Sequence, residues 1–265
     1  MTGRIRAVIF DWAGTTVDHG SLAPVSPFVE AFRRAGVAIT TAEARGPMGV
    51  AKRDHIAAIL ALPRVAAAWQ AGHGRAADEA DVDRLFADFL PLQHEALTRH
   101  ADVIPGVPEV VAECRRRGIK IGINTGYPRA LMDVAAPLAR AGGFDPDVII
   151  CNDDVPRGRP APWMIFRALE RLDAFPMSGV VVVDDTPVGV EAGLNAGARV
   201  VAVTRTGNAL GLSLREVERL DPADLAARLA PIAADFRRRG AHAVVEAVAD
   251  LIPVLDRFEA GDRPP

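Results

Sequence analysis

The sequence predicts an α/β fold in which a doubly wound parallel sheet forms the core and a small helical domain is inserted. Three observations support this prediction. Short runs of β-branched and apolar residues recur along the chain, and helical stretches separate the later runs. This alternation stops after the first run and resumes near residue 103, and the first four runs each end in a polar cluster. Alternating strands and helices are typical of a parallel, Rossmann-like sheet covered on both faces.

The individual elements follow from the length and spacing of the apolar residues. Runs of four apolar residues bounded by polar residues fit buried strands, whereas longer stretches with a 3.6-residue period fit helices. We expect strands at residues 7–10, 120–123, 148–151, 180–183 and 200–203. Helices are expected at residues 108–117, 129–141 and 163–172. After residue 205 the chain is polar and Arg-rich, and we expect it to be helical to about residue 258.

The segment between the first two expected strands predicts a second, helical domain. It is rich in alanine, and its apolar residues have helical spacing, as in Phe28 and Phe32 or Ile56 and Ile59. The stretches "HGSLAPVSP" and "DVIPGVP" at its ends contain the Gly and Pro residues expected of hinges. We therefore expect a core formed by residues 1–19 and 103–265, with residues 20–102 as the helical insertion.

Composition narrows the class of partner. The chain has 265 residues, of which 49% are hydrophobic and 25% charged, and its net charge is −3. This charge gives no reason to expect nucleic acid or an anionic membrane surface as a partner. No apolar run approaches a membrane span, and the first run is too short for a signal-peptide core. The two cysteines are too few for a disulfide framework and lack CxxC spacing, so we expect a reducing, cytoplasmic environment.

The polar residues after the expected strands suggest phosphoryl-transfer chemistry. Asp11 follows the first strand, Thr125-Gly126 the second, and Asp184-Asp185 the fourth. Ligands of parallel sheets gather at the carboxyl ends of the strands. There a nucleophilic carboxylate, a hydroxyl with backbone N–H groups for phosphate oxygens, and hard oxygen ligands for Mg²⁺ would meet. A single strand-terminal aspartate could simply cap a helix, but the combination favours a catalytic site.

Three of these stretches resemble motifs of the haloacid dehalogenase superfamily. "VIFDWAGTTVD", "INTGY" and "VVVDDTPVGVEAGLNAG" are similar to its first, second and fourth motifs, and a cap inserted after the first motif is also typical of it. The usual first motif is D-x-D, in which the first Asp attacks phosphorus and the second protonates the leaving oxygen. Here Ala13 replaces the second acid. The alternative reading of that replacement is a degenerate, inactive phosphatase.

Further stretches resemble the phosphonoacetaldehyde hydrolase (phosphonatase) family. They are "GPMGVAKRDHI" in the insertion and "DDVPRGRPAPWM" in the core, together with "FDWAGTTVD" and "NTGYPRALMD". The similarity extends from Ala7 to about Asp250. It implies hydrolysis of the P–C bond of phosphonoacetaldehyde, Mg²⁺ as cofactor and a role in 2-aminoethylphosphonate degradation. It also implies a homodimer formed through the cap domain.

The chemistry explains why Ala13 and a cap lysine occur together. A P–O bond leaves an alkoxide that benefits from a general acid, whereas a P–C bond would leave a carbanion. If a lysine amine condenses with the neighbouring aldehyde, cleavage delivers the electrons to an enamine. Lys52 is one of only two lysines, and the resemblance implies that it forms this imine while Asp11 attacks phosphorus. Lys120, at the start of a strand, is expected at the surface.

The resemblance assigns roles to the remaining site residues. His55 lies three residues after Lys52, on the same helical face, and would help to move protons during imine formation. Arg159 would steady the nucleophile and the phosphonate, with Arg157 as its nearest competitor. Substrate contacts are expected from Met48, Gly49, Thr125, Gly126 and Tyr127.

The metal site departs from the family in its fourth motif. The resemblance implies ligands from Asp11, the backbone carbonyl of Ala13 and the pair Asp184 and Asp185. Close relatives tend to carry Gly-Asp-Thr and a later Asp, whereas this chain has Asp184-Asp185-Thr186 and then Gly189. Whether Asp184 binds the metal directly or through water stays open. This motif also leaves two alternatives: a P–O phosphatase or phosphomutase of the superfamily, and a non-catalytic binding protein with this fold.

Overall fold

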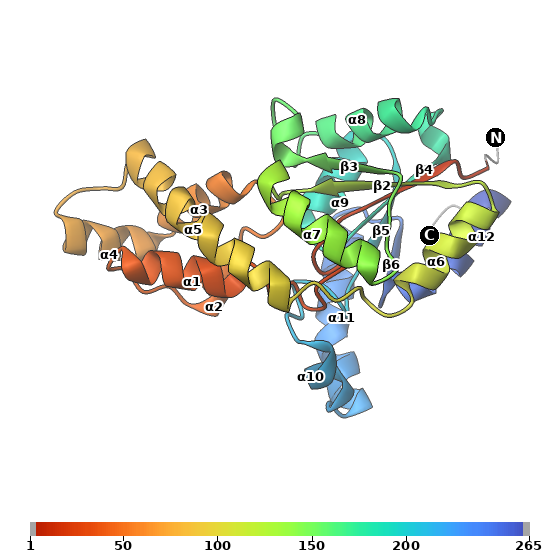
Figure 1. The fold of residues 1–265 in the computed structure, drawn as a ribbon. Coiled ribbons are helices and arrows are strands. Elements are labelled where there is room, and N and C mark those ends of the chain that lie inside the picture. Colours follow the sequence, from red (N-terminus) through yellow and green to blue (C-terminus); the bar gives the residue numbers. More distant parts are fainter. Residues whose placement is uncertain (1–3, 262–265) are drawn as a thin grey trace.

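The computed structural model describes residues 4–261 and contains one six-stranded parallel sheet in that range (Figure 1). The strand order is β3-β2-β1-β4-β5-β6. Because β1 lies between β2 and β4, the residue after β1 is placed in the middle of the sheet edge. The strands are β1 (Ala7–Phe10), β2 (Lys120–Thr125), β3 (Val148–Cys151), β4 (Val180–Asp184), β5 (Arg199–Val203) and β6 (Ala243–Val245).

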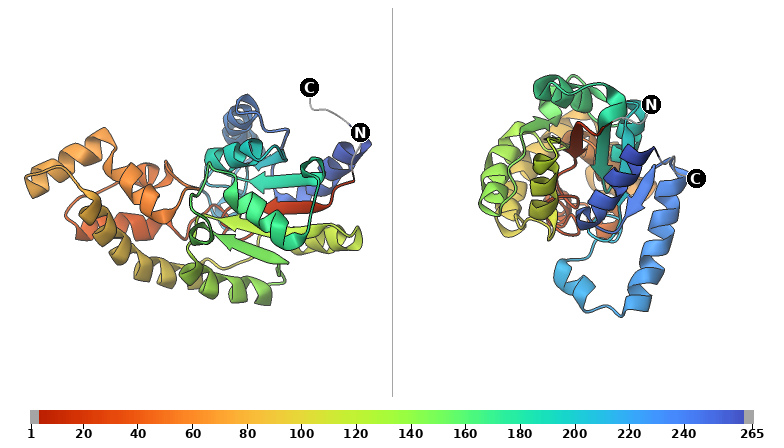
Figure 2. Two further views of the ribbon diagram at one scale, coloured as in Figure 1. Left: turned by 90° about the horizontal axis from the view of Figure 1, so that it is seen from above. Right: turned by 90° about the vertical axis from the view of Figure 1, so that its right-hand side faces the viewer.

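Helices cover both faces of the sheet, as expected for a doubly wound fold (Figure 2). Side chains alternate along β1, so Val8 and Phe10 face one layer while Ala7 and Ile9 face the other. The first layer contains α6 (Val107–Arg116), α7 (Arg129–Ala141) and α12 (Leu251–Ala260). The second contains α8 (Trp163–Leu172), α9 (Pro187–Asn195) and α11 (Pro222–Arg238). The short helix α10 (Leu214–Glu218) lies before α11, and single 3-10 turns occupy Asn152–Asp154, Met177–Gly179 and Val248–Asp250.

The inserted segment forms five helices with a hydrophobic core of their own. Its members include Trp69, and the Phe28 and Phe89 rings, which stack with centroids 4.4 Å apart. We call these helices the cap; it lies beyond the carboxyl ends of the strands (Figure 1). The expected helical cap is confirmed, while its boundaries at residues 20 and 102 stay a prediction. The helices are α1 (Val25–Arg34), α2 (Thr41–Arg45), α3 (Lys52–Leu60), α4 (Pro63–His73) and α5 (Glu79–Arg99).

The expectation of helix from residue 205 to residue 258 is wrong in two segments. Residues 205–213 form a loop, and residues 239–250 contain a short strand instead of a helix. Ala243–Val245 forms β6, which pairs in parallel with β5 at the sheet edge. Its three residues lie in the alanine-rich sequence "GAHAVVEAVAD", which has no strand alternation of its own. The strand exists because β5 offers backbone partners, which is a tertiary effect that local sequence does not reveal.

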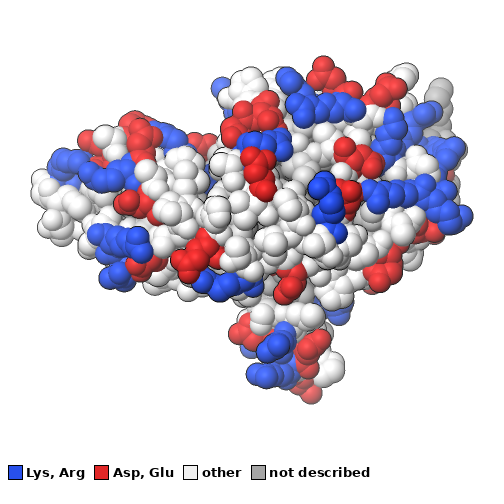
Figure 3. All heavy atoms as spheres, viewed as in Figure 1, with Lys and Arg blue, Asp and Glu red and all other residues white. Residues whose placement is uncertain are grey.

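The surface mixes charges of both signs on the face seen in Figure 3. Lys120 is exposed, as expected from its place at the start of β2. Within residues 4–261, no helix combines the length and the apolar character that a membrane span requires.

Candidate active site

The site lies where the carboxyl ends of β1, β2 and β4 meet the cap. Its cavity has a volume of ≈ 20 Å³, which is roughly room for a single water molecule. Core and cap both contribute to the lining. The lining residues are Asp11, Ala13, Ser21, Met48, Gly49, Lys52, Thr125, Gly126, Tyr127, Arg159 and Thr186. The structure thus brings together most of the residues expected at the site.

Three buried carboxylates form the floor of the site. Asp11, Asp184 and Asp185 each offer an oxygen, and these oxygens lie within 4.8 Å of one another. Thr15 Oγ1 donates a hydrogen bond to Asp185 Oδ1 over 2.8 Å. The backbone N–H of Asn208 donates to Asp185 Oδ2 over 2.7 Å. Asp185 is therefore fixed by two donors from different parts of the core.

The electrostatics of this cluster fit a divalent cation. Burial raises the pKa of Asp184 to about 6, although Arg159 acts in the opposite direction. Burial raises the pKa of Asp185 well above its ordinary value, and the charges of Asp11 and Asp184 add to the effect. Among the described residues, Asp184 Oδ2 has no hydrogen-bond partner although it is buried. Hard oxygen donors crowded in this way suit Mg²⁺, which would relieve their mutual repulsion.

Gly189 explains how the unusual fourth motif keeps an acid in place. A Cβ atom on Gly189 would lie 1.9 Å from Asp184 Oδ2, so the carboxylate occupies the space next to this glycine. The later Asp that the family resemblance implies would start from that same space. An acid at position 184 and a glycine at 189 therefore form a compensating pair.

Arg159 joins the nucleophile candidate to the metal acids. Its Nη2 donates a hydrogen bond to Asp11 Oδ1 over 2.6 Å and lies 3.3 Å from Asp184 Oδ2. The same nitrogen donates to the backbone oxygen of Asn124 over 2.6 Å. Arg159 is buried, whereas its competitor Arg157 is exposed. Removing either member of this buried pair would leave an unpaired charge, so the pair holds Asp11 in a fixed orientation.

Lys52 is a buried amine at the start of α3. Its side chain is packed between rings, with Nζ 4.8 Å from the Tyr127 ring centroid and 5.7 Å from that of Phe28. Met48 Sδ lies 3.9 Å from Nζ. Burial lowers the pKa of Lys52 to about 8, opposed by Asp11 and assisted by Arg159. A substantial fraction of the amine is therefore neutral near pH 8, as a nucleophile requires.

His55 and Tyr127 surround the amine without hydrogen bonding to it. His55 Nε2 lies 2.8 Å from the carbonyl oxygen of Ala44, which makes Nε2 the donor and leaves Nδ1 as an acceptor. Burial lowers the pKa of His55 to about 3, so the ring is neutral at pH 7. In the part of the chain that the structure describes, neither His55 Nδ1 nor the Tyr127 hydroxyl has a hydrogen-bond partner. His55 does not line the cavity, whereas Tyr127 does.

Backbone atoms bring the cap loop close to the core. Gly49 has a φ of +100°, and a Cβ atom there would lie 2.5 Å from Thr186 Oγ1. A Cβ on Gly126 would lie 2.6 Å from the carbonyl oxygen of Val50. At Gly126 a side chain would collide with backbone, and at Gly49 it would collide with core side chains and require a positive φ, so both positions favour glycine. The two glycines therefore allow Met48 and Lys52 to reach the sheet edge.

Sequence reasoning missed several residues that belong to this site. Ser21 and Thr186 line the cavity, Asn124 holds Arg159, and Thr15 and Asn208 hold Asp185. Thr15 and Thr186 lie inside the quoted motifs and could have been found there. Asn208 lies in a loop after β5 and carried no signal in the sequence.

Asp18 is a further buried acid that the sequence analysis did not single out. Its oxygens accept hydrogen bonds from the backbone N–H groups of Leu22 and Ala23, over 3.0 and 2.8 Å. Burial raises the pKa of Asp18 to about 7. The carboxylate thus shapes the turn through which the chain enters the cap.

Comparisons with known proteins identify the family of the chain. The family model described as haloacid dehalogenase-like hydrolase matches residues 5–197. A phosphonoacetaldehyde hydrolase of Paraburkholderia phytofirmans is 47% identical over 98% of this chain and 99% of its own length. That of Nitratidesulfovibrio vulgaris is 44% identical, covering 99% of this chain and 95% of the relative.

A solved structure shows the same fold over nearly the whole chain. It is described as a phosphonoacetaldehyde hydrolase-like protein from Oleispira antarctica, with a TM-score of 0.96 and 38% identity. The alignment covers 99% of this chain and 97% of that one. The chain therefore belongs to the haloacid dehalogenase-like hydrolases and, among them, to the phosphonoacetaldehyde hydrolase family.

Proposed function

We propose that the protein hydrolyses the P–C bond of phosphonoacetaldehyde, giving acetaldehyde and phosphate. One observation carries the proposal: the buried Lys52 amine shares a cavity with Asp11, while Ala13 takes the place of the usual second acid. An amine beside a phosphorus-directed carboxylate suits a substrate that has an aldehyde next to its phosphonate carbon. The names of the relatives support this reaction.

The proposed steps use Lys52 as electron sink and Asp11 as nucleophile. The neutral amine adds to the aldehyde and water is lost, which gives an iminium ion. Asp11 then forms a bond to phosphorus, the P–C bond breaks, and its electron pair enters the enamine. Water hydrolyses the aspartyl-phosphate, and the enamine takes up a proton before its imine is hydrolysed. Two waters are consumed and one released, so the net reaction uses one water.

Mg²⁺ would be held by Asp11, Asp184, Asp185 and the backbone carbonyl of Ala13. When bound, it supplies positive charge that offsets the negative phosphonyl oxygens. Arg159 adds a second positive group, with its Nη2 2.6 Å from Asp11 Oδ1. The remaining phosphonyl oxygens would bind the Thr125 hydroxyl and the backbone N–H of Gly126.

The other residues near Lys52 would govern proton movement and substrate fit. His55 lies on the same helix as Lys52, and its neutral, unpartnered Nδ1 is proposed to accept a hydrogen bond from the group that carries protons during imine formation. Met48, Gly49 and Tyr127 would enclose the aldehyde end. Since the cavity measures ≈ 20 Å³ and is smaller than the substrate, the cap must move away from the core to admit it.

A direct assay tests the proposal. The enzyme is incubated with phosphonoacetaldehyde and Mg²⁺, and acetaldehyde and phosphate are both measured. Equal amounts of the two products are expected. A series of phosphate monoesters serves as the comparison, because the alternative is a P–O phosphatase or phosphomutase. Turnover of a monoester without acetaldehyde formation from phosphonoacetaldehyde would favour that alternative.

The pH dependence of kcat/KM should show the free amine. Because burial lowers the pKa of Lys52 to about 8, kcat/KM is expected to rise with pH through about 8 and then level off. The same shift affects stability. The pKa of Lys52 is about 8 in the folded protein and about 10.4 in the unfolded chain, so between these pH values the unfolded chain binds more protons. The free energy of unfolding is therefore expected to increase as the pH rises from about 8 to about 10.4. Measuring kcat/KM over a series of pH values under Mg²⁺ saturation locates this rising limb of the profile. A limb centred near 10.4 would contradict a buried, neutral amine.

The compensating pair in the fourth motif gives a prediction for metal binding. Asp184→Gly alone should weaken Mg²⁺ binding, by on the order of tenfold or more, because one carboxylate ligand is lost. Gly189→Asp alone should also weaken it, since the new side chain collides with Asp184. The double variant should bind Mg²⁺ more tightly than either single variant. Calorimetric Mg²⁺ titration measures this, and additive losses in the double variant would show that the two positions do not compensate.

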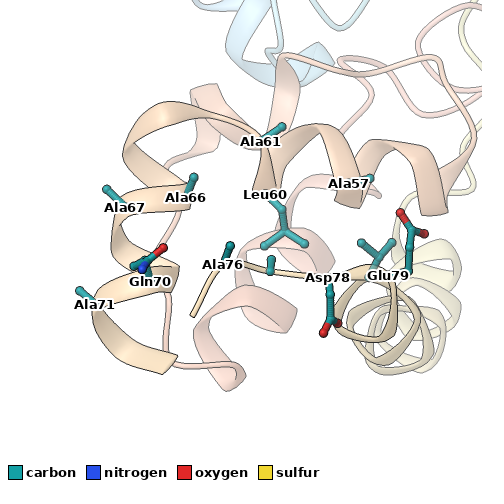
Figure 4. Close-up of a pocket in the computed structure, with 12 residues that line it drawn as sticks. Ala57, Leu60, Ala61, Ala66, Ala67, Gln70, Ala71, Ala76, Asp78 and Glu79 are labelled. Carbon is teal, nitrogen blue, oxygen red and sulfur yellow. The ribbon is translucent and has the colours of Figure 1, made fainter. Parts of the chain in front are cut away.

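We also propose a homodimer that forms through the cap. Residues of α3, α4 and the connection to α5 line an apolar hollow of ≈ 860 Å³ on the cap (Figure 4). Many of its lining residues are alanines, among them the exposed Ala66, Ala67 and Ala71. Light scattering should give a dimer for the wild type and a monomer for Ala67→Glu, because a charge would be placed in the interface. A monomeric wild type at micromolar concentration would contradict the proposal.

We further propose a cytoplasmic location. Cys114 and Cys151 are both free thiols, as expected in a reducing compartment.

A further inference from the structure

Arg45, the last residue of α2 in the cap, crosses to the core. Its Nη1 donates hydrogen bonds to the Asn208 side-chain Oδ1 and to the backbone oxygen of Gly20, each over 2.9 Å. Its Nη2 donates to the backbone oxygen of Gly211 over 3.2 Å. In return, Asn208 Nδ2 donates to the backbone oxygen of Arg45 over 3.2 Å. One cap arginine therefore bonds both to a core loop and to the hinge.

Other cap arginines do not behave in this way. Arg64 pairs with Glu43 and the carbonyl of Ala38, and Arg53 pairs with Glu79 and Asp83, so both stay within the cap. Arg45 instead faces backbone and amide oxygens, with no carboxylate within ion-pair distance among the described residues. Its charge is compensated only by the more distant Asp18, Asp185 and Glu216. The hydrogen bonds of Arg45 therefore connect the cap to the core.

The core partner of Arg45 is tied directly to the acid cluster. The backbone N–H of Asn208 donates to Asp185 Oδ2 over 2.7 Å, while its side chain binds Arg45. The loop is also closely packed there, since a Cβ on Gly207 would lie 2.6 Å from Asp185 Cβ. Asn208 consequently touches Asp185 with its backbone and the cap with its side chain.

On the cap side, Arg45 begins the segment that carries Lys52. The N–H of Met48 donates to the Arg45 carbonyl over 3.1 Å, and Met48 Sδ lies 3.9 Å from Lys52 Nζ. Gly49 follows and lies against Thr186 of the core. A displacement of Arg45 would therefore be passed along this short segment to the amine.

We propose that Arg45 and Asn208 form a latch that positions Lys52 and Asp185 relative to each other when the cap lies on the core. Both are positioning residues, because they act through these two groups. The latch holds the cap loop at one end and the Asp185 carboxylate at the other. The importance of Lys52 and Asp185 for the reaction rests on the proposed function, but the latch itself rests on the hydrogen bonds between cap and core.

The two lysines of the chain allow a sharp test. Reductive methylation with formaldehyde and cyanoborohydride labels free amines, and peptide mass spectrometry separates Lys52 from the exposed Lys120. The ratio of their labelling rates, without substrate, reports how often Lys52 leaves its buried position. Arg45→Met, which keeps an apolar stem but loses the donors, should raise this ratio by on the order of tenfold. Asn208→Ala, which keeps the backbone N–H to Asp185, should raise it by less.

Arg64→Met is the matched control, because it removes a cap arginine that does not reach the core; its ratio should equal that of the wild type. Thermal unfolding shows whether each variant folds. If Arg45→Met does not fold, the labelling ratio of Asn208→Ala provides the test. A ratio within about twofold of the wild type in the folded variants, or an equal rise in Arg64→Met, would overturn the latch. Mg²⁺ affinity by calorimetry should fall in both latch variants. Labelling needs no turnover, so failure of the latch and failure of P–C cleavage are seen in separate experiments.

Discussion

Replacing Lys52 by arginine is expected to abolish P–C cleavage, with a loss of more than about 10⁴-fold in kcat, as for the removal of a covalent catalyst. Arginine keeps the positive charge but cannot be deprotonated in a protein, so it cannot form an imine. The measurement is acetaldehyde and phosphate release under Mg²⁺ saturation. Since the side chain is buried beside Tyr127 and Phe28, thermal unfolding is measured alongside to show that the variant folds.

Lys120→Arg is the matched control, being the same substitution at the other lysine, and it should keep full activity. Borohydride trapping adds a second readout. In the wild type and in Lys120→Arg, substrate plus borohydride should inactivate the enzyme and leave a reduced adduct on the peptide that contains Lys52. If Lys52 stays unmodified and activity survives the treatment, the imine mechanism is wrong.

The second large effect is expected at the nucleophile. Asp11→Asn should lower phosphate release by more than about 10⁴-fold, because the amide cannot form the aspartyl-phosphate. It keeps the shape of the side chain and can still accept a hydrogen bond from Arg159 through its oxygen. The imine should still form, since Lys52 is intact. Borohydride trapping is therefore expected to succeed in a variant that does not turn over.

This pattern separates the two halves of the chemistry. Asp11→Asn should give an adduct without product, whereas Lys52→Arg should give neither. Phosphate release near the wild-type rate from Asp11→Asn would show that another group attacks phosphorus. Loss of trapping in Asp11→Asn would show instead that Asp11 is needed to form the imine.

Most of the core architecture could be predicted because its strands are locally distinctive. The runs expected at residues 7–10 and 148–151 match β1 and β3, and the other three expected strands differ from those observed by at most two residues at an end. These strands are buried on both faces and need continuous apolar sequence. β6 escaped prediction because it is a short edge strand whose formation depends on pairing with β5.

The site could be predicted where it is encoded in motifs, and not where it depends on distant loops. Arg159 could be preferred to Arg157 only by resemblance, and the structure places Arg159 on Asp11. The partners of Asp185 illustrate the limit. Thr15 is contained in a recognisable motif, whereas Asn208 contacts Asp185 through its backbone N–H, a group that every residue except proline carries. No residue type at position 208 could have revealed that contact.

The contact of Gly49 and Gly126 with the opposing segments has a consequence for selectivity. On this side the chamber is bounded by the main chain of the two glycines, with Gly49 against the Thr186 side chain and Gly126 against the Val50 carbonyl. Substitutions at these two glycines can fill the boundary but cannot move it outward. The distance between Asp11, which would attack phosphorus, and the Lys52 amine therefore depends on the course of the loop that contains Gly49. Point substitutions at these glycines would therefore only shorten the chamber, which disfavours a homologous aldehyde with one more methylene.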